Sequence, residues 1–464
     1  MKHNNNKGLK PTLAALFGTA LASLSGCGGS SDGNSDSGSI QLYNGTTNGP
    51  TMTLSIADVA RTTAELGNVT STHSYTTDDY DFAIQYRNDQ GNLVDIISDT
   101  LSIRNDTKTL LMMYGNIEEQ KLLSVDLPYR ETSDMFSLQM LNVTNAERNF
   151  DLYMAADDGV FEQAELVGSA MFETLSASTE HKIDDYTFYL TEAGGTTPIW
   201  QSDETRINVD DALVMAIRPS YDNSSDYLTV DIITNGNTPY SLKNKDAQAQ
   251  VQFYNSMDEY PSAQFTASKG DFQLSTASTD ADTLSQTLQL APNSYSISML
   301  DEQGNTLVDN YLLTLEQEQS ALGVFYKDAE HGPRLMSVAQ NLVPNSVSHQ
   351  VTVVNLVDEY AGLPVNKLDI YFTLDGQPIS QTEHHLDSLN SYGAKSLTLL
   401  DKTYGFYAIL EDNGQEIVLH QQGAVDVTAD GNYIMILEAD ASTTSGYKLT
   451  SLHTVAAQGE ELAQ

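Results

Sequence analysis

A single cysteine, Cys27, carries the most distinctive reactive group in this sequence. It follows an apolar stretch from Leu13 to Leu24, and that stretch is preceded by lysines at positions 2, 7 and 10. A basic start, a short apolar run and small residues at the cleavage point are typical of a secretory signal peptide. The apolar run is shorter than the roughly 20 residues that a membrane-spanning helix needs. We therefore predict a signal peptide over residues 1–26.

The run Leu24-Ser25-Gly26-Cys27 resembles the lipobox of bacterial lipoproteins. The resemblance implies that the thiol of Cys27 is diacylated, that Cys27 becomes the first residue of the mature chain, and that a membrane is its partner through lipid. In that family, glycine rather than aspartate after the cysteine goes with the outer membrane, and Gly28 follows here. An ordinary cleaved signal peptide is the alternative, but it needs no cysteine at this position.

Other groups that could carry out chemistry are sparse. The sequence has no Gly-x-Ser-x-Gly nucleophile elbow, no Gly-x-Gly-x-x-Gly and no Gly-Lys-Ser/Thr loop. With Cys27 acylated, the chain has no thiol nucleophile and can form no disulfide. We therefore predict no catalytic residues and no cofactor, and we expect Trp200, the only tryptophan, to pack on its own domain rather than to bind sugar.

The densest set of metal-ligand types is Glu383-His384-His385-x-Asp387. Neighbouring residues of a strand point to opposite faces, so His384 and His385 could not readily share one ion there. We therefore interpret this set as an exposed polar loop. Asp157-Asp158-Gly159 and Asp32-x-x-x-Asp36 lack the spaced oxygens of an EF-hand. No metal site is predicted, although weak calcium bridging between acidic loops stays open.

The chain is strongly acidic, with 63 Asp and Glu against 22 Lys and Arg and a formal net charge of −41. Such a surface repels nucleic acid and anionic lipid, and it is compatible with a cationic partner. Residues 28–39 are Gly, Ser, Asp and Asn without an apolar side chain, so we predict a flexible linker over residues 27–39.

The chain repeats itself four times with a period of about 100 residues. Each repeat opens on an apolar segment that ends in asparagine, at Asn44, Asn142, Asn255 and Asn355. Further on, each has a Tyr-x-apolar-x-apolar segment that starts at Tyr80, Tyr186, Tyr295 and Tyr404. The predicted units are residues 1–26 (signal peptide), 27–39 (lipidated cysteine and linker), 40–130, 131–245, 246–346 and 347–455 (repeats 1 to 4), and 456–464 (polar tail).

The second landmark alternates with the period of a strand, and a Gly-containing turn follows it, which indicates a β-hairpin. Each repeat then reaches a closing run that is apolar on both faces, such as Leu110 to Tyr114, as expected of a strand between two covering layers. A short helical turn near Ile56 to Leu66 is the one helical candidate. Short strands punctuated by Gly, Asn and Asp predict an all-β chain of four tandem immunoglobulin-like antiparallel β-sandwich domains.

This order of segments resembles a family of domains of unknown function that occur in tandem in secreted and surface-attached bacterial proteins. Ala291-Pro-Asn-Ser-Tyr295 resembles the Ala-Gly-x-Tyr that precedes the family's hairpin, and the family's His-Ala-Ser-Pro is absent. The resemblance implies an immunoglobulin-like sandwich and no catalytic residues.

We predict a non-enzymatic outer-membrane lipoprotein that displays tandem sandwiches as a structural, adhesion or interaction module. Its expected partners are envelope proteins, surface polysaccharide or matrix. A carbohydrate- or ligand-binding lipoprotein of an uptake or degradation system is the alternative, and a hydrolase ranks third.

Overall fold

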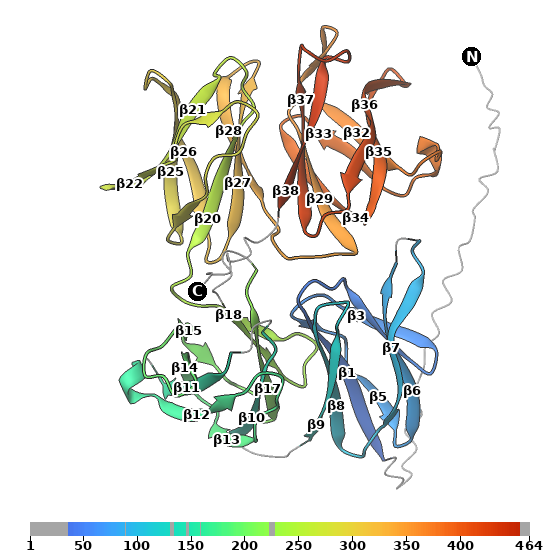
Figure 1. Ribbon diagram of the computed structural model, residues 1–464, viewed down its shortest axis with the longest axis vertical. Helices are drawn as coiled ribbons and strands as arrows, with labels where there is room; N and C mark the ends of the chain where they lie inside the picture. The colour runs from blue at the N-terminus through green and yellow to red at the C-terminus, as the bar shows by residue number, and fades with distance from the viewer. Residues whose placement is uncertain are drawn as a thin grey trace, which may run out of the picture. The chain divides into compact units, whose positions relative to one another are not determined.

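The computed structural model describes residues 36–88, 90–129, 134–144, 148–157, 159–221 and 228–454. The predicted signal peptide, Cys27, the polar tail, Asp32 and Asp158 therefore lie outside the described residues. The described part consists almost entirely of strands, with two short 3-10 turns, η1 (Phe161–Gln163) and η2 (Ile379–Gln381). None of its helical segments has the length and apolar character needed to cross a bilayer. The predicted all-β class is confirmed (Figure 1).

The strands of the first two repeats follow one another in a common order. Repeat 1 contains β1 (Ser37–Thr46), β2 (Met52–Ile56), β3 (Val59–Ala64), β4 (Asn68–Val69), β5 (His73–Thr76), β6 (Asp79–Arg87), β7 (Leu93–Ser102), β8 (Thr107–Gly115) and β9 (Lys121–Pro128). Repeat 2 contains β10 (Met135–Asn142), β11 (Phe150–Ala156), β12 (Glu165–Ala170), β13 (Thr179–Lys182), β14 (Asp185–Glu192), β15 (Trp200–Gln201), β16 (Thr205–Arg206), β17 (Ala212–Pro219), β18 (Leu228–Ile233) and β19 (Tyr240–Leu242).

The last two repeats keep this order. Repeat 3 contains β20 (Ala249–Asn255), β21 (Ser262–Lys269), β22 (Phe272–Ser275), β23 (Thr279–Asp280), β24 (Leu288–Leu290), β25 (Asn293–Asp301), β26 (Thr306–Leu315), β27 (Ser320–Asp328) and β28 (Gly332–Ala339). Repeat 4 contains β29 (Ser348–Asn355), β30 (Glu359–Tyr360), β31 (Leu363–Pro364), β32 (Lys367–Thr373), β33 (His385–Asn390), β34 (Gly393–Leu400), β35 (Lys402–Asp412), β36 (Gln415–Val427), β37 (Asn432–Ala439) and β38 (Tyr447–Thr454). The domain boundaries near residues 130, 246 and 346 stay predictions.

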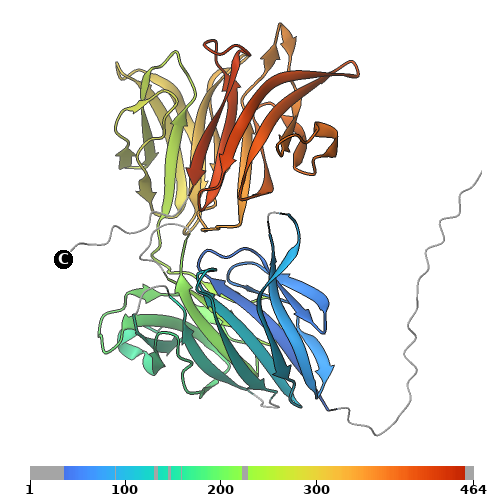
Figure 2. The ribbon, with the colours of Figure 1, turned by 45° about the vertical axis from the view of Figure 1, so that its right-hand side comes forward.

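Every repeat is a sandwich of two main sheets, as Figures 1 and 2 show, and repeat 4 has an additional two-stranded sheet, β30-β31. One sheet contains the opening and closing strands, in the order β4-β1-β8-β9 in repeat 1 and β34-β29-β37-β38 in repeat 4. The other contains the predicted hairpin, in the orders β3-β2-β6-β7 and β33-β32-β35-β36. Repeats 2 and 3 have the same arrangement, so the sandwich prediction is confirmed.

One strand pairing in each repeat is parallel, although the sequence predicts antiparallel sandwiches. The opening strand pairs in parallel with the closing strand, as β1 with β8, β10 with β17, β20 with β27 and β29 with β37. All other strand pairs in the described sheets are antiparallel. The chain crosses to the second sheet between the two strands, and a crossover is what a parallel pair requires.

The tyrosine and the two apolar residues of the Tyr-x-apolar-x-apolar segment face the core, as predicted. Phe188 on β14 is fully buried in the core of repeat 2, together with Tyr186 and Leu190. Trp200 lies in the same core, and its indole N–H donates to the carbonyl oxygen of Leu228 at 2.8 Å. In repeat 4 the equivalent Phe406 is fully buried. Each sandwich therefore has its own core, and Trp200 packs inside its domain as expected.

A second kind of core joins the repeats in pairs. One side of β8 places Leu111 and Met113 in the core of repeat 1, while Leu110 and Met112 on the other side pack against repeat 2. Repeats 3 and 4 are joined in the same way. Their shared core contains Tyr254, Leu322, Val324, Val338, Val354, Leu356, Ile434 and Ile436. The second covering layer expected from the sequence is therefore the sheet of the neighbouring repeat.

Two local expectations about the first repeat are wrong. Strand β1 begins at Ser37, so the last three residues of the expected linker are in a sheet, where they pair with β5 and β8. Gly38 permits this because a Cβ there would lie 2.2 Å from the carbonyl oxygen of Arg104. The stretch expected as a helical turn is the β2–β3 hairpin, with positive φ at Ala57 and Asp58 as in a type I′ turn.

The second predicted boundary is only partly exposed. In the stretch from Lys243 to Asp246, Asn244 is buried and Lys243 lies 3.4 Å from the carboxylate of Glu318 in repeat 3. Contacts with the next repeat therefore cover Asn244, whereas Lys245 and Asp246 are exposed.

Phe188→Ala should lower the free energy of unfolding of repeat 2 by about 3–5 kcal/mol, because it leaves a cavity in that core. Trp200 is the only tryptophan and lies in the same core, so its fluorescence reports the unfolding of this repeat in the full chain. We expect the denaturant midpoint of the Trp200 signal to fall. Phe406→Ala, at the matching position of repeat 4, should leave that midpoint in place. An unmoved midpoint with Phe188→Ala would contradict the core assignment.

Candidate functional site

We call the contact between two paired repeats, with its shared core, a joint. Each joint contains one tyrosine from an opening strand. Ile40 and Leu42 of β1 face the core of repeat 1, so the alternation of the strand turns Tyr43 toward repeat 2. Tyr254 occupies the same place before Asn255 on β20 and faces repeat 4. Both side chains are fully buried, so both hydroxyl groups need hydrogen-bond partners inside the joint.

At the joint between repeats 1 and 2, the partner of Tyr43 is a buried carboxylate. Its hydroxyl donates to Oδ2 of Asp231 on β18 at 2.7 Å. The same oxygen accepts from Nε of Arg218 at 2.7 Å, and Oδ1 accepts from the hydroxyl of Ser241 at 2.7 Å. Asp231 has no solvent exposure, and these donors from both repeats compensate the cost of burying its charge.

Backbone contacts complete this joint. The ammonium of the fully buried Lys108 donates to the carbonyl oxygen of Thr234, and the amide of Gln41 donates to the carbonyl oxygen of Gly236 at 3.0 Å. Burial lowers the pKa of Lys108 to about 8. Gly67 lies against Arg218, since a Cβ at this position would be 2.6 Å from Nη2. The joint is thus specified by hydrogen bonds as well as by apolar packing.

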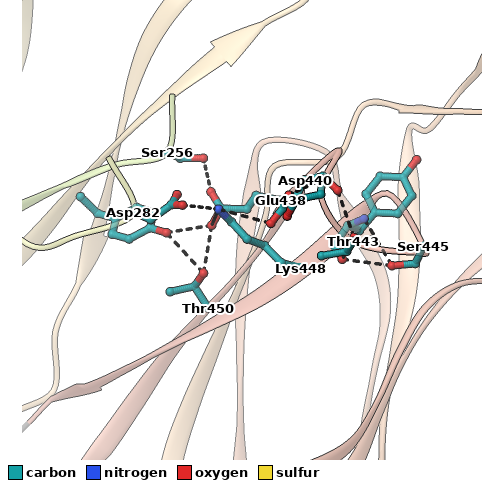
Figure 3. A network of polar contacts seen from close by, with 11 residues as sticks. Ser256, Asp282, Glu438, Asp440, Thr443, Ser445, Lys448 and Thr450 are labelled. Atoms are coloured by element: carbon teal, nitrogen blue, oxygen red, sulfur yellow. Dashed lines mark hydrogen bonds and ion pairs between the residues drawn. The ribbon is translucent and has the colours of Figure 1, made fainter. Parts of the chain in front are cut away.

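At the joint between repeats 3 and 4, the carboxylate is Glu438 on β37. The hydroxyl of Tyr254 donates to its Oε1 at 2.8 Å, and Thr450 donates to the same oxygen at 3.0 Å. The hydroxyl of Ser256 donates to Oε2. Figure 3 shows Ser256 and Thr450 approaching Glu438 from two directions. A carboxylate of repeat 4 is therefore solvated by hydroxyl groups of both repeats.

Lys448 lies beside this cluster and attracts three carboxylates (Figure 3). Its ammonium is 2.5 Å from Asp282 of repeat 3, 3.8 Å from Glu438 and 3.9 Å from Asp440. Burial opposes the charge on Lys448, but Asp282 and Glu438 outweigh burial and raise its pKa. Lys448 therefore supplies the cation that this acidic joint needs.

The two joints use equivalent positions with different residues. Arg218 follows the closing-strand residue that pairs with Asn142, and Glu438 follows the one that pairs with Asn355. The same position therefore holds a cation in the first joint and an anion in the second. In both joints, nevertheless, the tyrosine donates to a carboxylate of the neighbouring repeat.

Burial also changes the acidity of the joint groups. It raises the pKa of Tyr43 well above its usual value, and Asp231 adds to the rise. Burial raises the pKa of Tyr254 in the same way, and Glu438 adds to it. Both phenols therefore stay protonated at neutral pH, as donors must. Burial raises the pKa of Glu438 as well, while the hydrogen bonds from Ser256 and Tyr254 oppose that rise.

The structure places the metal-ligand types of repeat 4 apart. His384 lies edge-on to Tyr404 with ring centroids 5.6 Å apart, whereas His385 stacks on Tyr371 at 5.8 Å. The two rings have different partners, as the strand argument predicts. Glu383 and His384 lie outside the strands, as the exposed-loop interpretation has it, but that interpretation is wrong from His385 on, where β33 begins. Within the described ranges, no group of three or more His, Cys, Asp or Glu is arranged to hold a metal ion.

The joint residues were not identified from the sequence, and Cys27, the predicted lipidation site, lies outside the described residues. A signal for the joints is nevertheless present. Tyrosine precedes the landmark asparagine in the odd repeats, at Tyr43 and Tyr254, and an aliphatic residue does so in the even ones, at Leu141 and Val354. This alternation shows that the larger unit is a pair of repeats.

Comparison with known proteins gives distant likenesses only. No family model matches the chain, and no curated protein matches it. Among solved structures, the Bacillus anthracis TIE protein is 9% identical over 88% of this chain and 75% of its own, with a TM-score of 0.15. The streptococcal ancillary pilin is 8% identical over 64% of this chain and 99% of its own, also with a TM-score of 0.15. TM-scores this low do not define a shared fold.

Tyr43→Phe should lower the free energy of unfolding of the first pair by about 1–3 kcal/mol, because Asp231 loses a buried donor. The denaturant midpoint of Trp200 fluorescence should fall, although Tyr43 lies in another repeat. Tyr254→Phe, the matched change at the second joint, should leave the Trp200 midpoint unchanged. If neither substitution moves it, the first joint does not stabilise repeat 2.

Glu438→Gln should change how stability depends on pH. The pKa of Glu438 is raised in the folded chain, so the folded state holds the proton more tightly than the unfolded state. The native protein should therefore lose stability relative to the variant as pH rises from about 4.3, the usual value for Glu, through the folded pKa. Denaturant unfolding across this range measures the difference. If the stability of the native protein relative to the variant stays constant or increases as pH rises, the raised pKa of Glu438 is contradicted.

Proposed function

We propose that the chain is a non-enzymatic lipoprotein of the bacterial outer membrane that displays its four sandwiches as an interaction module of the cell envelope. Lipid on Cys27 would attach it, and the sandwiches would present surfaces to envelope or extracellular partners. The observation that carries this proposal is the pairing of the sandwiches through shared cores. Such joints fix the orientation of one domain on the next.

The chemistry of the buried groups supports a structural role. The buried groups Tyr43, Arg218, Lys108, Tyr254 and Glu438 have altered pKa values, and all five lie at joints between repeats. Shifted groups of this kind occur at active sites and also in structural networks. Here four of the five groups hydrogen-bond to the neighbouring repeat, and Arg218 binds Asp231, which accepts from Tyr43, so their effect is to hold two domains together.

The repetition itself favours display over catalysis. A catalytic protein needs one site, whereas a surface module gains reach and binding area with each added domain. The acidic charge keeps such an extended surface soluble and attracts cationic partners.

Cys27→Ala should release the protein from the membrane fraction or leave it unprocessed, because no other thiol is present to accept the acyl chains. Fractionation of cells followed by immunoblotting measures this. Gly28→Asp is the matched control: it should keep the lipid and move the protein from the outer to the inner membrane. Tight outer-membrane association of the Cys27→Ala protein would refute the anchor.

A further inference from the structure

The outer sheet of each repeat is the one that contains the predicted hairpin and takes no part in a joint. In repeats 2 and 4 this sheet carries a pair of tyrosines that repeats 1 and 3 lack. On repeat 2, Tyr153 of β11 pairs with Tyr189 of β14, and on repeat 4, Tyr371 of β32 pairs with Tyr407 of β35. A glutamine lies next in each row, Gln201 or Gln421. The corresponding pairs in the odd repeats are small or polar: Ser55 with Ala83, and Thr266 with Ser298.

In repeat 2 the chain itself covers one tyrosine of the pair, Tyr189, while Tyr153 is partly exposed. Phe161, from turn η1, lies edge-on to Tyr153 at 5.1 Å and to Tyr189 at 5.5 Å between ring centroids. The hydroxyl of Tyr189 donates to the carbonyl oxygen of Gly159 at 2.7 Å, and only 3% of the residue is exposed. Repeat 2 therefore shows that a planar side chain fits on such a pair.

In repeat 4 the equivalent pair remains accessible. The corresponding turn, η2, begins with Ile379 rather than an aromatic residue. Tyr371 and Tyr407 are both partly exposed. His385, on the edge strand β33, stacks on Tyr371 with an angle of 23° between the rings and extends the row to the sheet edge.

Carboxylates lie beside this open row, and Lys367 and Lys395 lie at its β33 edge, where they donate to Ser388 and to the carbonyl oxygen of Asp387. Asp369 lies two residues before Tyr371 on the same face of β32, and Asp387 lies 3.6 Å from Nε2 of His385. Burial raises the pKa of Tyr371, and the negative charges of Asp369, Asp387 and Glu416 add to the rise. An aromatic face bordered by carboxylates attracts a planar cation, through its π electrons and through charge.

We infer that the outer sheet of repeat 4 binds an arginine of a basic polypeptide, with the guanidinium over the Tyr371–Tyr407 pair and its charge facing Asp369 and Asp387. The net charge of −41 would bring a basic chain to the surface, and the tyrosine pair would select where it docks. This inference names the partner class of the proposed interaction module and rests on that proposal.

Binding to the full-length protein in neutral detergent tests it. The probe is a fluorescent nonapeptide of alternating arginine and serine, followed by anisotropy at low and physiological ionic strength. Changing both Tyr371 and Tyr407 to Leu keeps apolar bulk on the strands but removes the aromatic faces, and should weaken binding at least about fivefold. Tyr371→Phe should bind within about twofold of the native protein, because it keeps the ring.

Tyr153→Leu on repeat 2 is the matched control, since Tyr153 occupies the same register in a pair that Phe161 already contacts, and it should leave binding unchanged. Asp387→Asn should weaken binding most at low ionic strength. Equal binding by the double leucine variant would overturn the inference and show attraction by the acidic surface as a whole. Preference for cellohexaose, or for a neutral peptide with phenylalanine in place of arginine, would also overturn it. Neither result affects the Cys27 anchor, which membrane fractionation tests separately.

Discussion

The structure depends on strands that are apolar on both faces. A sandwich covers only one face of each sheet, so β1 and β8 would leave Leu110, Met112 and Tyr43 in water if repeat 1 stood alone. Burying apolar area stabilises by about 25 cal/mol per Å², which makes an uncovered sheet face costly. The sheet of the next repeat covers it. Four sandwiches therefore become two pairs, and the repetition in the sequence serves the joints as well as the domains.

Apolar packing alone would allow many relative positions of two sheets, and the buried polar groups restrict them. The Tyr43–Asp231 and Tyr254–Glu438 hydrogen bonds form in one register, and a shifted sheet would leave a buried carboxylate without its donor. Such groups contribute specificity more than net stability. The open aromatic row on repeat 4 lies on the opposite sheet, so it stays free of the joint.

Much of the fold could be predicted because its signals are local. The strand period around Tyr186 and Phe188, the turns with glycine and the four-fold recurrence each depend on neighbouring residues, and the structure confirms them. The parallel β1–β8 pairing could not be predicted, because the sequence of a strand does not record the direction of its neighbour. Asp231 and Tyr43 are 188 residues apart, so only the three-dimensional pairing reveals their contact. The linker prediction failed at Ser37 to Ser39 because these residues pair with β5 and β8 through their backbone, and Gly38 and Ser39 are buried although neither is apolar.

The central claim is that the sandwiches are joined in pairs and do not act as four separate domains. Differential scanning calorimetry of the full chain tests it most directly, because each cooperative unit produces its own transition. The pairing predicts at most two transitions, with the one that Trp200 fluorescence follows having the enthalpy of about two domains. Four independent transitions, each with the enthalpy of one domain of about 100 residues, would contradict it.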